Sequence, residues 1–143
     1  VLGAGDIFIG ANALDYRRKL AGVLVGLDTG GTIGTVLGKL VGKRIELIIP
    51  IGLEKLVYED IYEISRRLAE PGTEGPRMMP VWGTIITEIE AVKVLTGAEA
   101  LLVSSGGVGG AEGSVRLLVR GNRDQLEAVE KLMDSIWGEP PWC

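Results

Sequence analysis

Short aliphatic runs alternate along the chain with longer segments in which apolar residues recur every three or four positions. The short runs are bounded by glycine or proline, which is typical of buried strands, and they predict strands at residues 6–10, 22–26, 44–50, 100–104 and 114–120. The periodic segments predict helices at residues 33–41, 53–69 and 84–95, and a final helix capped by Asn122 with Gln125 at its third position. Residues 11–15, 71–80 and 105–113 are predicted to be loops.

The order of these elements predicts an α/β fold. We expect the part up to about residue 70 to form a layered, mostly parallel sheet with flanking helices, followed by a C-terminal α-β-β-α portion. A chain of 143 residues fits one domain, so residues 1–143 are expected to form a single α/β domain. Because the sequence begins without Met and enters a strand almost at once, we also expect that residues upstream of Val1 are missing.

Composition and charge argue against two classes of binding partner, nucleic acids and membranes. Hydrophobic residues make up 46 % of the chain and aromatic residues 5 %, so the core is expected to be aliphatic. The net charge of −4 and the scattered Lys and Arg argue against a nucleic-acid partner, which needs clustered positive charge. All apolar runs are shorter than the roughly 18 residues of a membrane helix, so no membrane partner is expected. The scarcity of Asn and Gln is a tendency of thermostable proteins.

The chain contains no histidine and a single cysteine, Cys143. The absence of histidine excludes Ser–His and Cys–His catalysis and His-ligated metal sites, so no metal site is expected. One cysteine cannot form an internal disulfide, which suits a reducing compartment and predicts a cytoplasmic protein. At the end of the chain, Cys143 is also a poor candidate for a nucleophile. Any catalysis would therefore use Asp, Glu, Lys, Tyr, Ser or Thr, and no particular cofactor is implied.

A glycine-rich turn joins the predicted strand at residues 22–26 to the predicted helix at residues 33–41. It consists of Thr29, Gly30, Gly31 and Thr32. Glycines allow backbone amides to point outward, the helix that follows adds its positive dipole end, and the two hydroxyls can donate hydrogen bonds. The turn therefore predicts a binding site for a phosphate or a carboxylate. The alternative is an ordinary strand-to-helix turn with a threonine cap.

Three carboxylates follow the ends of predicted strands, where ligands lie in parallel α/β sheets. Glu54 and Lys55 come just after the strand at residues 44–50, and Asp15 and Asp28 follow the two earlier strands. The three acidic residues are candidate catalytic groups, with Glu54 as a general base, and Lys55 is a candidate anion contact. The alternative is that Glu54 and Lys55 are ordinary charges in the first turn of a helix.

A second glycine-rich segment connects the two strands predicted at residues 100–104 and 114–120. Gly106 and Gly107 belong to it, and Glu112 lies near its end. A hairpin rarely needs so many glycines, so the segment is a candidate ligand-binding loop with Glu112 as an acid or base. The alternative is a mobile linker.

Residues 26–40 resemble the phosphate loop of ribose-5-phosphate isomerases, because Thr29-Gly30-Gly31-Thr32 stands where that family has T-G-S-T. Residues 6–15, with the sequence DIFIGANALD, resemble the G-A-D-x-I-D segment of the same superfamily, which also contains CoA transferases and initiation-factor-2B-like proteins. The resemblance implies a related α/β fold and a phosphate held by the turn. It also places Asn12, at the position of an acidic residue in the family pattern, among the ligand-binding residues.

Three functions remain open on these observations. The first is an isomerase-like or transferase-like enzyme acting on a phosphorylated or carboxylated metabolite. The second is a non-catalytic ligand-binding or regulatory domain. The third is an assembly module, in which edge strands or C-terminal helices form a homo-oligomer. In the first two, the partner is a small anionic molecule held by the Thr29–Thr32 turn.

Overall fold

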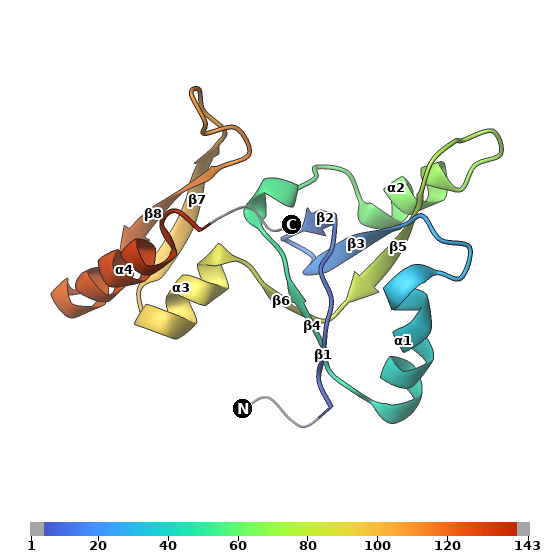
Figure 1. Cartoon of the computed structure of the whole chain (residues 1–143), viewed down its shortest axis with the longest axis horizontal. Coiled ribbons are helices and arrows are strands. Elements are labelled where there is room, and N and C mark those ends of the chain that lie inside the picture. The colour runs from blue at the N-terminus through green and yellow to red at the C-terminus, as the bar shows by residue number, and fades with distance from the viewer. Residues whose placement is uncertain (1–4, 140–143) are drawn as a thin grey trace. The chain divides into compact units, whose positions relative to one another are not determined.

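The computed structural model describes residues 5–139. The chain divides into two compact units, residues 1–87 and residues 88–143. The described residues form four α-helices, a short 3₁₀-helix and three β-sheets, which confirms the α/β class (Figure 1). The expectation that residues 1–143 form a single domain stays a prediction. Within residues 5–139, no helix is both long and apolar enough to cross a membrane.

A three-stranded parallel sheet forms part of the first unit. Its strand order is β1 (Ile7–Phe8), β4 (Leu47–Pro50) and β6 (Thr84–Ile86). The central strand β4 lies in the aliphatic run predicted from the sequence, and its first three residues are buried. A strand with neighbours on both edges and cover on both faces needs such a continuous apolar run.

An antiparallel sheet makes up the rest of the first unit's β-structure. It contains β2 (Ala13–Asp15), β3 (Leu20–Val25) and β5 (Arg77–Trp82) in that order. The prediction of one layered, mostly parallel sheet is therefore wrong, because β3 pairs with antiparallel neighbours on both sides. Residues 13–15, predicted to lie in a loop, form β2 because Ala13 and Leu14 are both buried and the strand pairs with β3.

The chain passes from one sheet to the other at Gly83, the only residue between β5 and β6 (Figure 1). A Cβ atom at Gly83 would lie 2.3 Å from the carbonyl oxygen of Leu47 on β4, so only glycine fits at this close approach. Residues 84–86, predicted as the start of a helix, therefore continue the strand. Residues 77–80, predicted as loop, belong to β5, which tolerates Pro80 because it is an edge strand.

The helix predicted at residues 53–69 is broken into two pieces. A short 3₁₀-helix, η1 (Leu53–Lys55), is followed by an extended stretch and then by α2 (Ile61–Leu68). The break arises because the chain pairs with β2 here: Val57 donates its amide hydrogen to the carbonyl of Leu14 over 3.1 Å. Asp60 is the N-cap residue of α2, and its carboxylate accepts from the amide of Glu63 at 3.1 Å.

Helix α2 covers one face of the antiparallel sheet. Ile61 packs with Ala13 and Leu20 in a buried cluster that Val57 and Met78 complete. The remaining helix of this unit, α1 (Gly31–Lys43), has one buried residue, Ile33. Two hollows lined partly by α1 form the candidate sites described below.

The second unit has the predicted α-β-β-α order. It consists of α3 (Glu88–Thr96), β7 (Glu99–Ser105), β8 (Val115–Arg120) and α4 (Arg123–Ile136), with β7 and β8 antiparallel. The predicted cap of the last helix is confirmed, because Asn122 and Gln125 each accept a hydrogen bond from the other's backbone amide. The side chain of Gln125 also donates to the carbonyl of Gly97 at 2.9 Å, which ties the start of α4 to the end of α3.

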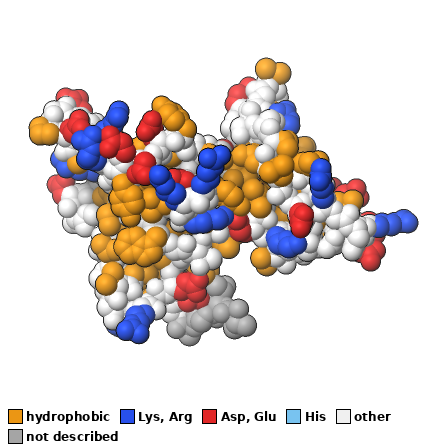
Figure 2. Space-filling model, turned by 180° about the vertical axis from the view of Figure 1, so that it is seen from behind, with side chains coloured by type: hydrophobic (Ala, Val, Ile, Leu, Met, Phe, Trp, Pro, Cys, Tyr) orange, Lys and Arg blue, Asp and Glu red, His pale blue; other side chains and the backbone are white. Residues whose placement is uncertain are grey.

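Many large hydrophobic side chains are exposed in both units. Figure 2 shows them gathered in patches on the surface, with charged side chains around them. Extended apolar patches of this kind are uncommon on folded monomers.

Candidate functional site

A hollow of about 430 Å³ lies beside the first turn of α1. Its wall comes from the end of β1 and the residues after it, from the second half of β3 with the turn that follows, and from the start of α1. These segments are residues 8–10, 23–27 and 30–33. Gly10, Gly26, Gly30 and Gly31 contribute backbone without side chains, which exposes peptide groups to the hollow.

The turn before α1 is built by two consecutive glycines in the left-handed region. Gly30 has φ 84° and Gly31 has φ 60°, values that residues with a Cβ atom rarely adopt. The amide of Gly30 donates to the carbonyl of Leu27 at 2.9 Å. Of the backbone amides predicted to bind an anion, that of Gly30 is therefore already hydrogen-bonded within the chain. Gly30 is also the N-cap residue and supplies no side-chain cap.

The next three amides belong to the first turn of the helix. Those of Gly31, Thr32 and Ile33 have no acceptor among the described residues, as expected for the first turn of an α-helix without a side-chain cap. The helix dipole adds a partial positive charge at the same place. All three residues line the hollow, so its wall can donate hydrogen bonds to an anion.

Close packing holds this turn in shape. A Cβ atom at Gly34 would lie 2.8 Å from the carbonyl oxygen of Thr29, and one at Gly30 would lie 3.0 Å from the Cα atom of Gly34. Thr29 and Asp28 belong to the turn, but neither lines the hollow. Of the two predicted hydroxyls, only that of Thr32 therefore belongs to a residue of the wall.

Asn12 holds β3 instead of lining the hollow. Its side-chain oxygen accepts from the amide of Leu24 at 2.9 Å, and its own amide donates to the carbonyl of Gly22 at 2.8 Å. These two bonds extend the pairing between β2 and β3 by one step. The structure thus gives Asn12 a role in fixing one wall of the hollow.

The candidate acid–base residues do not line the hollow at the start of α1. Asp15 accepts from the amide of Arg18 at 3.0 Å and from its guanidinium, which also binds Asp60. Glu54 lies in η1, with its carboxylate folded over Gly52 and 4.0 Å from the ammonium of Lys55. Asp15, Asp28, Glu54 and Lys55 are all absent from the wall of the hollow.

The glycine-rich segment of the second unit folds on itself. Gly106 donates to the carbonyl of Ser114 at 2.7 Å, and its own carbonyl accepts from Arg116 at 2.7 Å. Arg116 also passes beside Gly107, where a Cβ atom would lie 3.1 Å from its guanidinium. Glu112 accepts from the amide of Gly110 at 3.0 Å. These contacts order the loop, and its predicted ligand binding stays a prediction.

Helix α2 carries three charged groups with strongly shifted pKa values. The pKa of Glu63 is lowered to about 2, because the guanidinium groups of Arg66 and Arg67 donate hydrogen bonds to its carboxylate. The same bonds raise the pKa values of both arginines. The three residues form a charged network on the helix surface, away from the residues that line the hollow.

Sequence reasoning found the helix-side wall of the hollow but not the opposite one. Residues 8–10 come from the first strand and its end, and β1 is a neighbour of β4 rather than of β3. No local pattern in the sequence places them opposite the turn. Within the described part of the chain, no group of three or more Asp, Glu, His or Cys could hold a metal ion. Cys143 lies outside the described residues.

Comparisons of the chain with protein-family models, with curated proteins and with solved structures find no match.

Proposed function

We propose that the first unit binds a small anionic molecule, such as a phosphorylated or carboxylated metabolite, in the hollow at the start of α1. One observation carries the proposal: the amides of Gly31, Thr32 and Ile33 lack acceptors among the described residues and belong to the wall of a hollow of about 430 Å³. Helix N-termini with such amides are established anion-binding elements in proteins.

The surroundings favour binding without catalysis. None of the three candidate acid–base carboxylates lines the hollow, and Asp15 is held by Arg18. The rest of the wall is largely aliphatic and aromatic, with Phe8, Ile9 and Leu27 among its residues. Such a wall suits the carbon skeleton of a metabolite whose anionic group sits at the helix. A non-catalytic ligand-binding domain is therefore the form of the proposal that we prefer to an isomerase or a transferase.

Substitution of Thr32 tests this proposal. In the Thr32→Glu variant, a carboxylate in the first helical turn repels the ligand, because unit charges 4 Å apart near a surface interact by about 1–4 kcal/mol. We expect binding of inorganic phosphate and of sugar phosphates, measured by calorimetry, to weaken at least about fivefold. The helix itself should not lose stability, since a negative charge at its start is favourable by about 0.3–1 kcal/mol.

The matched control is Thr32→Gln, which has the same shape without the charge and should bind phosphate nearly as the native chain does. The proposal is wrong if Thr32→Glu binds phosphate with unchanged affinity, or if the native chain binds none of these anions.

A second candidate function, assembly of two copies, rests on the outer face of the β7–β8 hairpin. Leu101, Val103 and Leu118 are exposed there to 59 %, 55 % and 43 %, and Leu101 lies opposite Leu118. Glu99 and Arg120 are the next facing pair, and with the two leucines they line a shallow hollow. A two-fold axis parallel to the strands would place each Leu101 on Leu118 of the other copy and each Glu99 on its Arg120.

Charge reversal tests this arrangement. Arg120→Glu is expected to weaken self-association at least about tenfold, because it places two carboxylates together twice in the symmetric pair. The double variant Glu99→Arg with Arg120→Glu restores opposite charges and should associate as the native chain does. Sedimentation equilibrium measures both. A native chain that stays monomeric at high concentration would exclude this function.

A further inference from the structure

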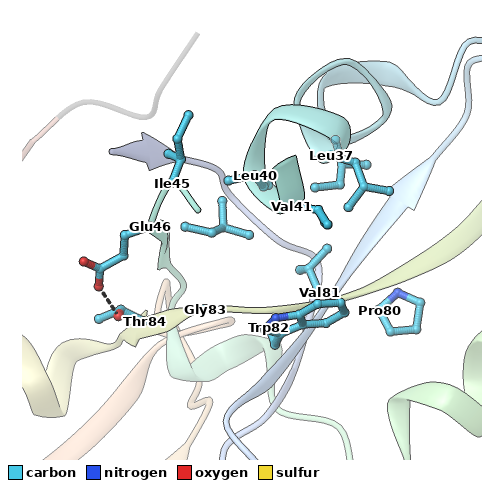
Figure 3. Close-up of a pocket in the computed structure, with 12 residues that line it drawn as sticks. Leu37, Leu40, Val41, Ile45, Glu46, Pro80, Val81, Trp82, Gly83 and Thr84 are labelled. Carbon is cyan, nitrogen blue, oxygen red and sulfur yellow. Dashed lines mark hydrogen bonds between the residues drawn. The ribbon is translucent and has the colours of Figure 1, made fainter. Parts of the chain in front are cut away.

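A second hollow, of about 360 Å³, lies along the side of α1. Leu37, Leu40 and Val41 project from the helix toward the strand that carries Val81, while Glu46 and Thr84 lie together at one end (Figure 3). The two ends differ in chemistry: one is an aliphatic chamber, and the other presents a carboxylate and a hydroxyl. A pocket of this size and composition is typical of small-molecule sites.

The polar end is formed by residues 38 positions apart in the sequence. Thr84 donates its hydroxyl hydrogen to one carboxylate oxygen of Glu46 over 2.6 Å. The parallel pairing of β4 with β6 brings them together, because Glu46 immediately precedes β4 and Thr84 opens β6. The bond orients the carboxylate and uses the only hydrogen of the hydroxyl. A ligand therefore meets acceptors here: the second carboxylate oxygen of Glu46 and the lone pairs of Thr84.

Charge decides what can occupy this hollow. Among residues 5–139, Glu46 is the only ionisable residue in its wall, which has no Lys or Arg from this part of the chain. An anionic ligand would face an unbalanced carboxylate, and a purely apolar ligand would leave its acceptors unused. A protonated primary amine satisfies both requirements, because it carries the opposite charge and has three hydrogens to donate.

We propose that this hollow binds an aliphatic primary amine. Its ammonium group donates to Glu46 and Thr84, and its hydrocarbon chain lies between the aliphatic side chains of α1 and Val81. Its wall shares one residue, Ile33, with the wall of the anion site at the start of α1. The two sites have opposite charge preferences, so a negative result for one leaves the proposal for the other unaffected.

The test compares three probes of similar length and different head group: octylammonium, octanol and octanoate. Binding is followed by the fluorescence of Trp82, which lines the hollow, in a variant that retains it as the only tryptophan. We expect octylammonium to bind about tenfold more tightly than octanol, and octanoate more weakly than either. Equal affinities for the three probes would overturn the proposal, as would a preference for octanoate.

Two variants locate the charge preference. Glu46→Gln keeps the shape and the acceptor for Thr84 and removes the charge, so octylammonium should bind about tenfold more weakly while the affinity for octanol stays unchanged. Glu74→Gln, on the exposed segment between α2 and β5, is the matched control and should leave all three affinities unchanged. If Glu74→Gln weakens octylammonium as much as Glu46→Gln does, the preference comes from net charge and the proposed site is wrong.

Leu40→Phe tests the aliphatic chamber. The larger side chain fills part of the hollow, so octylammonium and octanol should both bind at least about tenfold more weakly. Circular dichroism checks that the variant is folded. A folded Leu40→Phe chain that binds both probes as before would show that they bind elsewhere.

Discussion

Leu14→Ala is expected to lower the free energy of unfolding of the first unit by about 2–5 kcal/mol, the range observed when a buried leucine is truncated in a filled core. Leu14 is fully enclosed, and it lies on a strand that is paired with β3 on one side and bridged to Leu56 on the other. The surrounding chain has little freedom to close the resulting cavity. Urea denaturation, followed by circular dichroism, measures the change.

The control for this truncation is Leu95→Ala, since the side chain of Leu95 on α3 is 63 % exposed. It should change stability by less than about 0.5 kcal/mol, as surface substitutions usually do. Equal losses in the two variants would contradict the enclosed position of Leu14.

Gly83→Ala is expected to cost about 3 kcal/mol or more, the upper part of the range for forcing extra atoms into a packed interior. The added methyl group would lie 2.3 Å from the carbonyl oxygen of Leu47, and this neighbour is backbone on the central strand β4, which cannot rotate away. Either β4 or the junction of β5 with β6 must move. Thermal and urea denaturation both report the loss.

Gly38→Ala is the matched control. Gly38 lies inside α1, and a Cβ atom there meets nothing within 4 Å, so alanine should stabilise the chain by up to about 1 kcal/mol through its higher helix propensity. We therefore expect the free energy of unfolding to fall in Gly83→Ala and to rise in Gly38→Ala. A Gly83→Ala chain as stable as the native one would mean that β5 and β6 do not pass this close to β4.

The sequence predicted those elements whose stability is local. The aliphatic run at residues 44–50 contains β4, the strand at residues 22–26 overlaps β3, and the reciprocal bonds of Asn122 and Gln125 follow from their spacing. Where the prediction was wrong, pairing with another segment of the chain decides the structure. Residues 13–15 become a strand because β3 lies beside them, and the helix predicted at residues 53–69 is interrupted because Val57 pairs with Leu14.

The same distinction applies to the candidate sites. The strand–turn–helix at residues 23–33 supplies most of the wall of the hollow at the start of α1. It could be predicted because a glycine-rich turn before a helix is a local pattern. The choice of Asp15, Asp28 and Glu54 as candidate catalytic groups assumed one mostly parallel sheet, in which ligands lie at the strand ends. In the structure, β2 and β3 belong to a separate antiparallel sheet. The pairing of Glu46 with Thr84 has no local signal, since only the register of β4 and β6 creates it.

The passage of β5 into β6 through a single residue couples the folding of the two sheets in the first unit. Separation of β5 from β3 would loosen the attachment of β6 to β4. Separation of β6 from β4 would likewise loosen the pairing of β5 with β3. We therefore expect the two sheets to open together, so that hydrogen exchange of their backbone amides requires the same global opening.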